Sequence, residues 1–132
     1  KIAVLISGDL SHTHQASGPY GYSNASAPFD KAVGKWANND PCGWEAATAL
    51  LEQATELQPE AKSCGFTGYV LWHGMMCSAA NSPIRFDSRV FVNRNVTYYG
   101  MIASTFEVHS DIEDDNGDDG DKRIDFDLQK KS

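Results

Sequence analysis

The chain has 132 residues, 41% of them hydrophobic, which is enough for one domain with a core and too few for two ordinary domains. Its formal net charge is -7, but seven of the 18 acidic residues lie in 111–121, and the remaining 11 equal the 11 basic residues. This distribution excludes a basic surface for nucleic acid or for an anionic membrane. No apolar run approaches the ~20 residues that cross a bilayer, and no secretory leader is recognised, so we expect a cytoplasmic protein.

The three cysteines, Cys42, Cys64 and Cys77, are an odd set without a CxxC spacing. This usage predicts no disulfide framework and a reducing compartment. The chain begins at Lys1 directly before an apolar run, so we also expect it to be part of a longer or processed protein.

Residues 2–6 are short, continuous and rich in β-branched side chains, which predicts a buried parallel strand. Residues 13–27 contain glycine, proline, serine and asparagine at the density typical of a loop. A helix then follows Pro28, because apolar residues recur at the spacing of one helical face. That face consists of Phe29, Ala32, Val33 and Trp36.

A second helix is predicted from Asp40 and Pro41, an N-cap acceptor followed by a proline at the first helical position. Its buried stripe would consist of Trp44, Ala47, Leu50, Leu51, Ala54 and Leu57. Pro59 starts one further turn over 60–64, which Gly65 is placed to end. Residues 66–72 predict a second buried strand, and residues 74–88 a loop.

Residues 89–92 and 97–108 are rich in strand-forming side chains and predict two strands joined by a hairpin turn at 93–95. The acidic run within 109–121 predicts a solvated loop, with weak divalent-ion binding as the alternative. It lacks the calcium-loop pattern, because the sixth position counted from Asp111 is Asn116 rather than glycine. For residues 122–132 we expect a short strand or tail. Together these elements predict an α/β domain with a mixed, mainly parallel sheet flanked by helices.

Five blocks of sequence follow one another in a fixed order: Ser7–His12, Gly18–Tyr22, Phe29–Asp30, Glu60–Gly65 and Tyr98–Ala103. Over residues 1–108 their order and spacing resemble the C-terminal half of the class III extradiol ring-cleavage dioxygenase superfamily. These LigB-like proteins are typified by the catalytic subunit of protocatechuate 4,5-dioxygenase. The resemblance implies a non-heme Fe(II) cofactor and cleavage of a catechol-type ring with O2. Residues 109–132 have no counterpart that we recognise.

His12 follows the first predicted strand and a turn that contains glycine, the place where functional groups collect in open α/β sheets. The histidine that matches it in the family is the acid/base beside the metal. Imidazole suits that role because the catechol binds as an anion, so that a neutral base must take its proton. The alternative is a histidine that only caps the end of the strand.

Glu60 matches the position of the family's carboxylate metal ligand, in a facial triad of two histidines and one carboxylate. Its alternative role is that of a first-turn glutamate interacting with the helix dipole. Cys64 competes for the same place, since Memo-type relatives carry a cysteine of a Cys-Gly step at the metal site. A small buried thiol is the alternative for Cys64.

Tyr20 and Tyr22 follow the active-site turn and are candidates to line a substrate pocket, or to pack as a lid. His12 and His14 have an i, i+2 spacing that a metal pair could use. His14, His73 and His109 do not fall in the blocks that match the family's histidine ligands.

The resemblance therefore predicts extradiol cleavage that needs an N-terminal half, present as an upstream segment or a separate chain, to supply two histidine ligands. The expected partners are that half, a catechol-type small molecule and O2. One alternative is a non-catalytic LigB-like structural or interaction subunit. The other is a Memo-type metal-binding redox protein.

Overall fold

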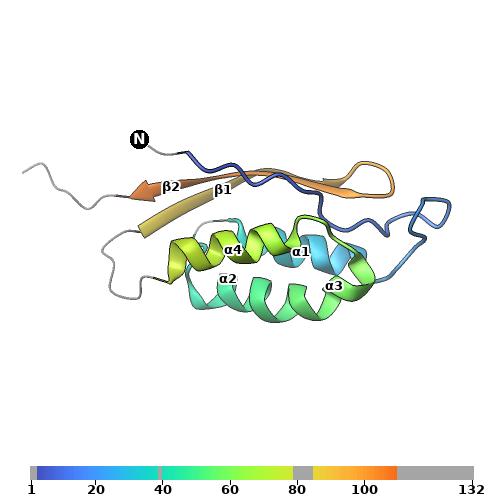
Figure 1. The fold of residues 1–132 in the computed structure, drawn as a ribbon, viewed down its shortest axis with the longest axis horizontal. Helices are drawn as coiled ribbons and strands as arrows, with labels where there is room; N and C mark the ends of the chain where they lie inside the picture. Colours follow the sequence, from blue (N-terminus) through green and yellow to red (C-terminus); the bar gives the residue numbers. More distant parts are fainter. Residues whose placement is uncertain (1–2, 39, 79–84, 110–132) are drawn as a thin grey trace, which may run out of the picture.

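The computed structural model describes residues 3–38, 40–78 and 85–109. A layer of helices packs beneath a two-stranded sheet, and the N-terminal segment runs along that sheet (Figure 1). The helices are α1 (Ser26–Trp36), α2 (Trp44–Thr48), the π-helix η1 (Ala49–Ala54), α3 (Thr55–Ala61) and α4 (Phe66–Cys77). The strands are β1 (Arg85–Asn95) and β2 (Gly100–His109).

Helix α1 contributes the centre of the core, as its apolar spacing predicts. Phe29, Val33 and Trp36 are buried, and the indole of Trp36 lies 5.3 Å, between ring centroids, from Phe106 of β2. Burying side chains of this size supplies most of the free energy that holds such a layer together. The predicted helical face is therefore confirmed.

The second predicted helix is continuous from α2 through η1 to α3, but its ends differ from the prediction. Gly43, in an extended conformation, precedes Trp44, and the Asp40 side chain instead accepts the backbone N–H of Cys42. Trp44, predicted to be buried, is 81% exposed at the first position of the helix. Pro59 lies inside α3, which ends at Ala61 with Lys62 at φ 55°.

Neither predicted buried strand is a strand. Residues 3–7 are extended but lie outside the sheet and are exposed, Leu5 to 90%. Residues 66–72 belong to α4, which also takes in residues 74–77 of the predicted loop. A short apolar run satisfies the pattern of a buried strand and of a buried helix equally well. Here the run follows the tight turn at Gly65 and continues as a helix.

The predicted hairpin is confirmed, with a longer first strand, a later turn and a second strand that begins at Gly100 rather than at residue 97. β1 and β2 are antiparallel, with Arg85 opposite His109 and Asn95 opposite Gly100, and the register shifts between Val90 and Val92. The turn is closed by a hydrogen bond from the Val96 N–H to the Tyr99 carbonyl, rather than lying at 93–95. Within the described residues the sheet is thus antiparallel, and the prediction of a mainly parallel sheet is wrong. The coarser prediction, a fold that combines helices with a sheet, is confirmed.

The segment around residues 8–14 is held on both sides by backbone hydrogen bonds. On one side Leu10 and His14 donate to the carbonyls of Gly100 and Tyr98 of the hairpin. On the other side His12 donates to the carbonyl of Ala61, at the end of α3. This segment therefore joins the sheet to the helical layer.

Cys42 and Cys77 form a disulfide that ties the loop before α2 to the end of α4. The expectation that the cysteines form no disulfide is wrong for this pair. The spacing of cysteines in the sequence cannot reveal which of them the fold brings together.

Among the helices of the described residues, none combines the length and the apolar character that crossing a bilayer requires. The predicted acidic loop and C-terminal tail, 110–132, lie outside the described residues.

Candidate functional site

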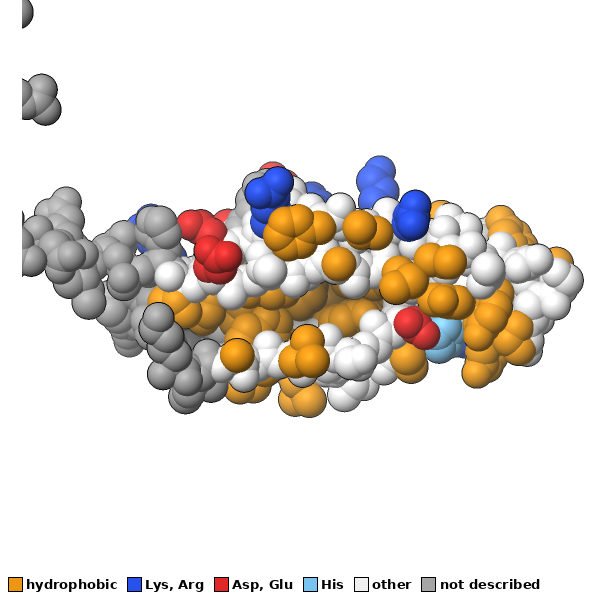
Figure 2. Space-filling model, turned by 90° about the horizontal axis from the view of Figure 1, so that it is seen from above, with side chains coloured by type: hydrophobic (Ala, Val, Ile, Leu, Met, Phe, Trp, Pro, Cys, Tyr) orange, Lys and Arg blue, Asp and Glu red, His pale blue; other side chains and the backbone are white. Residues whose placement is uncertain are grey.

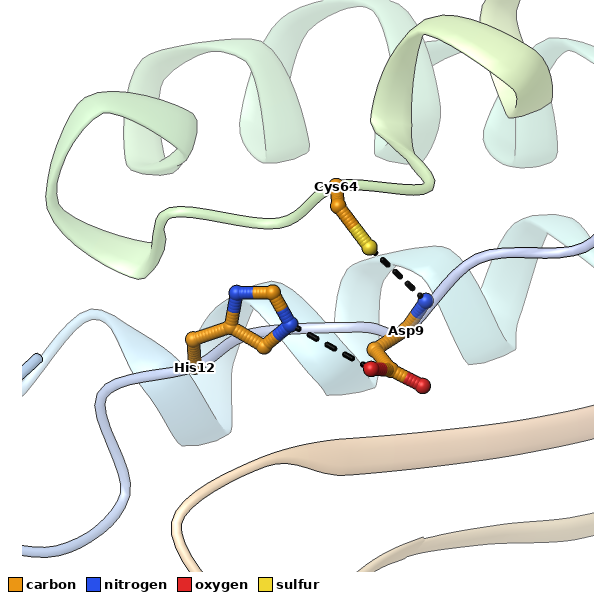
Figure 3. A group of neighbouring side chains, drawn as sticks. All are labelled: Asp9, His12 and Cys64. Atoms are coloured by element: carbon orange, nitrogen blue, oxygen red, sulfur yellow. Dashed lines mark hydrogen bonds and ion pairs between the residues drawn. The ribbon is translucent and has the colours of Figure 1, made fainter. Parts of the chain in front are cut away.

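Asp9, His12 and Cys64 come together where the N-terminal segment passes the loop between α3 and α4 (Figure 3). Each offers one ligand atom, and these atoms lie within 4.8 Å of one another. The His12 Nε2 atom lies 3.4 Å from Asp9 Oδ2, and the Asp9 backbone N–H donates to the Cys64 sulfur at 3.2 Å. We call these three residues the Asp–His–Cys group.

Two glycines allow the segments that carry this group to touch. A Cβ atom at Gly8 would lie 3.0 Å from the nitrogen of Gly65 and closer still to its Cα, so no larger residue fits without movement. The Gly65 N–H and the Ser63 hydroxyl both donate to the Asp9 carbonyl, at 3.1 Å and 2.8 Å. Asp9 is thus fixed through its backbone, and its carboxylate stays free to turn toward His12.

Tyr69 supports the same contact from inside the molecule. Its hydroxyl donates to the carbonyl of Gly8 at 2.8 Å, and its side chain is buried. Burial raises the pKa of Tyr69 well above its usual range, and the nearby Cys64 and Asp9 raise it further. The hydroxyl therefore stays protonated and remains a donor.

His12 is 12% exposed, and two tyrosine rings surround it. The Tyr20 ring stacks on the imidazole with centroids 5.1 Å apart, and the Tyr98 ring lies 6.4 Å away. Tyr22, the other predicted substrate residue, is 63% exposed and pairs through its backbone with His14. The structure thus brings Tyr20, but not Tyr22, into ring contact with His12.

Glu60, the predicted metal ligand, lies in the last turn of α3 with an exposed side chain. Its backbone carbonyl accepts the hydroxyl of Thr13. Glu60 is outside the Asp–His–Cys group, so its role as a ligand stays a prediction. Cys64 is exposed, which rules out the alternative of a small buried thiol.

Two other described histidines have polar partners elsewhere. His14 Nε2 lies 2.7 Å from Asp30 Oδ2 and 2.8 Å from the hydroxyl of Ser11. A catalytic triad would need the carboxylate and the hydroxyl on opposite ring nitrogens, and Ser11 is fully buried. His73 accepts the indole N–H of Trp36 inside the core. For His109, at the end of β2, only the backbone is described.

The donor chemistry of the Asp–His–Cys group fits a metal ion. Imidazole suits iron, copper, nickel and zinc, and a thiolate favours the softer of these. The group contains one histidine and one carboxylate, so a triad of two histidines and a carboxylate needs a histidine from outside it. The described residues thus fit part of a metal site.

Sequence reasoning identified His12 and weighed Cys64, but it missed Asp9 and Tyr98. Asp9 lies three positions before His12 in the Ser7–His12 block. In a tight turn this spacing can bring two side chains together, and it could have indicated Asp9 as a partner of His12. Tyr98 lies in the last of the five blocks. Only the fold shows that its ring meets His12.

No protein-family model matches the chain, and neither a curated protein nor a solved structure shows significant similarity to it. The LigB-like resemblance therefore depends on the five sequence blocks alone.

Proposed function

We propose that this chain carries the acid/base pair and one ligand of a metal-dependent oxidoreductase site of the LigB-like type. The substrate would be a catechol-type aromatic compound, and O2 the oxidant. The observation that carries the proposal is the Asp–His–Cys group, which unites Asp9 and Cys64 across 55 positions of sequence. The nearly buried imidazole of His12 beside the partly exposed Asp9 carboxylate and the exposed Cys64 thiol favours a site that handles protons next to a cation.

His12 is the proton acceptor in this proposal. When Nε2–H donates to Asp9, the lone pair of Nδ1 is free to take the proton of a catechol hydroxyl. The Asp9 carboxylate then stabilises the imidazolium that forms. Because His12 is nearly buried, the proton is held close to the substrate and can be returned later in ring opening.

A bound divalent ion, Fe(II) in the extradiol reaction, would supply positive charge that favours the catecholate and positions for O2. Cys64 is the ligand that the geometry favours, and Glu60 is the one that the resemblance favours. The two histidine ligands would come from an N-terminal half, as an upstream segment or as a partner chain.

The exposed thiol of Cys64 supports a second candidate, a Memo-type metal-binding redox protein. Its sulfur accepts the Asp9 N–H, which orients it toward the group. A thiolate ligand favours Cu(I) or Zn(II) over a single Fe(II) ion. The choice of metal therefore separates the two candidates.

The test is a calorimetric titration with Fe(II) under argon, Zn(II) and Cu(I), with the Cys42–Cys77 disulfide intact. It is done on the chain alone and on the chain together with the upstream segment or partner that accompanies it. We expect about one equivalent to bind, with binding lost in Cys64→Ala and retained in Glu60→Gln. His12→Gln should retain the metal and lose proton uptake from a catechol, read as the absorbance of the catecholate. Loss in Glu60→Gln alone would assign the ligand to Glu60. No binding of any of the three ions in either preparation would overturn the proposal and leave a structural subunit.

A further inference from the structure

Three rings meet beside the Asp–His–Cys group: His12, Tyr20 and Tyr98. We call them the aromatic cluster. The centroids of Tyr20 and Tyr98 lie 6.3 Å apart, and both rings are within 6.4 Å of the imidazole. Figure 2 shows an apolar hollow on one face of the molecule, with a histidine and an acidic side chain next to each other at its edge.

Tyr98 holds the turn that carries Tyr20. A Cβ atom on Gly18 would lie 2.6 Å from the Cβ of Tyr98, so the backbone of the turn rests directly on this side chain. Hydrogen bonds from Gly18 to Gln15 and from Gly21 to Gly18 shape the turn itself. Tyr20 is therefore placed over His12 by packing as well as by its own chain.

One ring of the cluster is exposed to solvent. Tyr20 remains 49% exposed although it stacks on a histidine that is nearly buried. Aromatic rings prefer offset or edge-on contact with other rings, and such contacts contribute beyond the area that they bury. A ring that is half exposed beside a proton acceptor offers this contact to a planar molecule.

We propose that Tyr20 and Tyr98 form the aromatic wall of the ligand site at His12 and select a planar aromatic ring over a saturated diol. This inference rests on the proposed function, because it concerns the substrate of the same site. Neither hydroxyl is required by the proposal. The flat face of each ring makes the contact, and Tyr98 also positions Tyr20.

The experiment measures binding of 4-nitrocatechol and of trans-cyclohexane-1,2-diol to the purified chain by calorimetry, with and without Zn(II). We expect the catechol to bind more tightly than the saturated diol. Tyr20→Leu and Tyr98→Leu should each weaken 4-nitrocatechol binding about fivefold to tenfold, whereas Tyr98→Phe should bind within twofold of the wild type. Phe91→Leu, an exposed aromatic residue of β1, is the matched control and should bind as the wild type does.

Equal affinity for the two ligands, no binding of 4-nitrocatechol by the wild type, or an unchanged affinity in Tyr20→Leu would overturn the inference. Thermal unfolding checks that each variant folds. If Tyr98→Leu does not fold, Tyr20→Leu decides the matter. The proposed function has a separate readout, which is metal binding. A protein that binds 4-nitrocatechol but no metal would contradict the proposed metal site and leave the inference about the aromatic wall standing.

Discussion

Replacing Gly8 with alanine should weaken both the fold and the Asp–His–Cys group. The new methyl group would meet the backbone of Gly65, which cannot turn aside as the end of a flexible side chain can. Gly8 is not among the residues with positive φ, so the cost is steric rather than conformational. Overpacking of this kind costs about 1–3 kcal/mol of stability.

The same change should lower metal affinity. To relieve the clash, the segments that carry Gly8 and Gly65 must separate by on the order of 1 Å. A displacement of this size is enough to impair a binding or catalytic site whose residues come from different segments. Cys64 would move away from Asp9 and His12, and we expect the metal dissociation constant to rise about tenfold or more.

Gly74→Ala is the matched control. Gly74 lies within α4, and a Cβ atom there would meet nothing within 4 Å. Alanine is favoured over glycine inside a helix by about 0.5–1 kcal/mol, so this variant should be more stable than the wild type. Urea unfolding followed by circular dichroism measures both variants. A Gly8→Ala protein with wild-type stability and wild-type metal affinity would refute the close-contact argument.

The remaining predictions concern the covalent link and the buried histidine. Reducing Cys42–Cys77, or replacing both residues with serine, should lower stability by about 4 kcal/mol, from the chain-entropy model for a separation of 35 residues. Thiol titration under denaturing conditions should count one thiol before reduction and three after it, and three before reduction would contradict the link. Burial lowers the pKa of His73 from 6.5, so the unfolded chain takes up a proton first, and stability should fall as the pH drops below 6.5. Urea midpoints at pH 7.5 and 5 should differ less in His73→Gln; an equal difference would show that His73 is not responsible.

The elements that could be predicted from sequence are those whose pattern of apolar residues fits only one type of secondary structure. α1 has four apolar residues on one face, and the hairpin has two runs rich in strand-forming residues, although the polar residues 93–95 belong to β1 and not to the turn. The apolar run at 66–72 fits a strand and a helix equally well, because its apolar residues are not confined to one face. In the fold it became a helix, since Gly65 and Tyr69 start a helical turn against the N-terminal segment.

For the candidate site too, the sequence indicates one part and not the rest. His12 is visible in the sequence because it follows an apolar run and a turn that contains glycine. Its partners depend on contacts between distant segments: Cys64 meets Asp9 only because Gly8 and Gly65 touch, and Tyr98 reaches His12 only through the pairing of residues 10–14 with the hairpin. The Cys42–Cys77 pair is hidden for the same reason.

The most direct test of the metal site is absorption spectroscopy of the chain titrated with Co(II), comparing the wild type with Cys64→Ser. With Cys42 and Cys77 joined in a disulfide, Cys64 is the free thiol among the described residues. We predict a thiolate-to-cobalt charge-transfer band that saturates near one equivalent in the wild type and is missing in Cys64→Ser. A wild-type spectrum without this band, or the same band in Cys64→Ser, would contradict the assignment of Cys64 as a metal ligand.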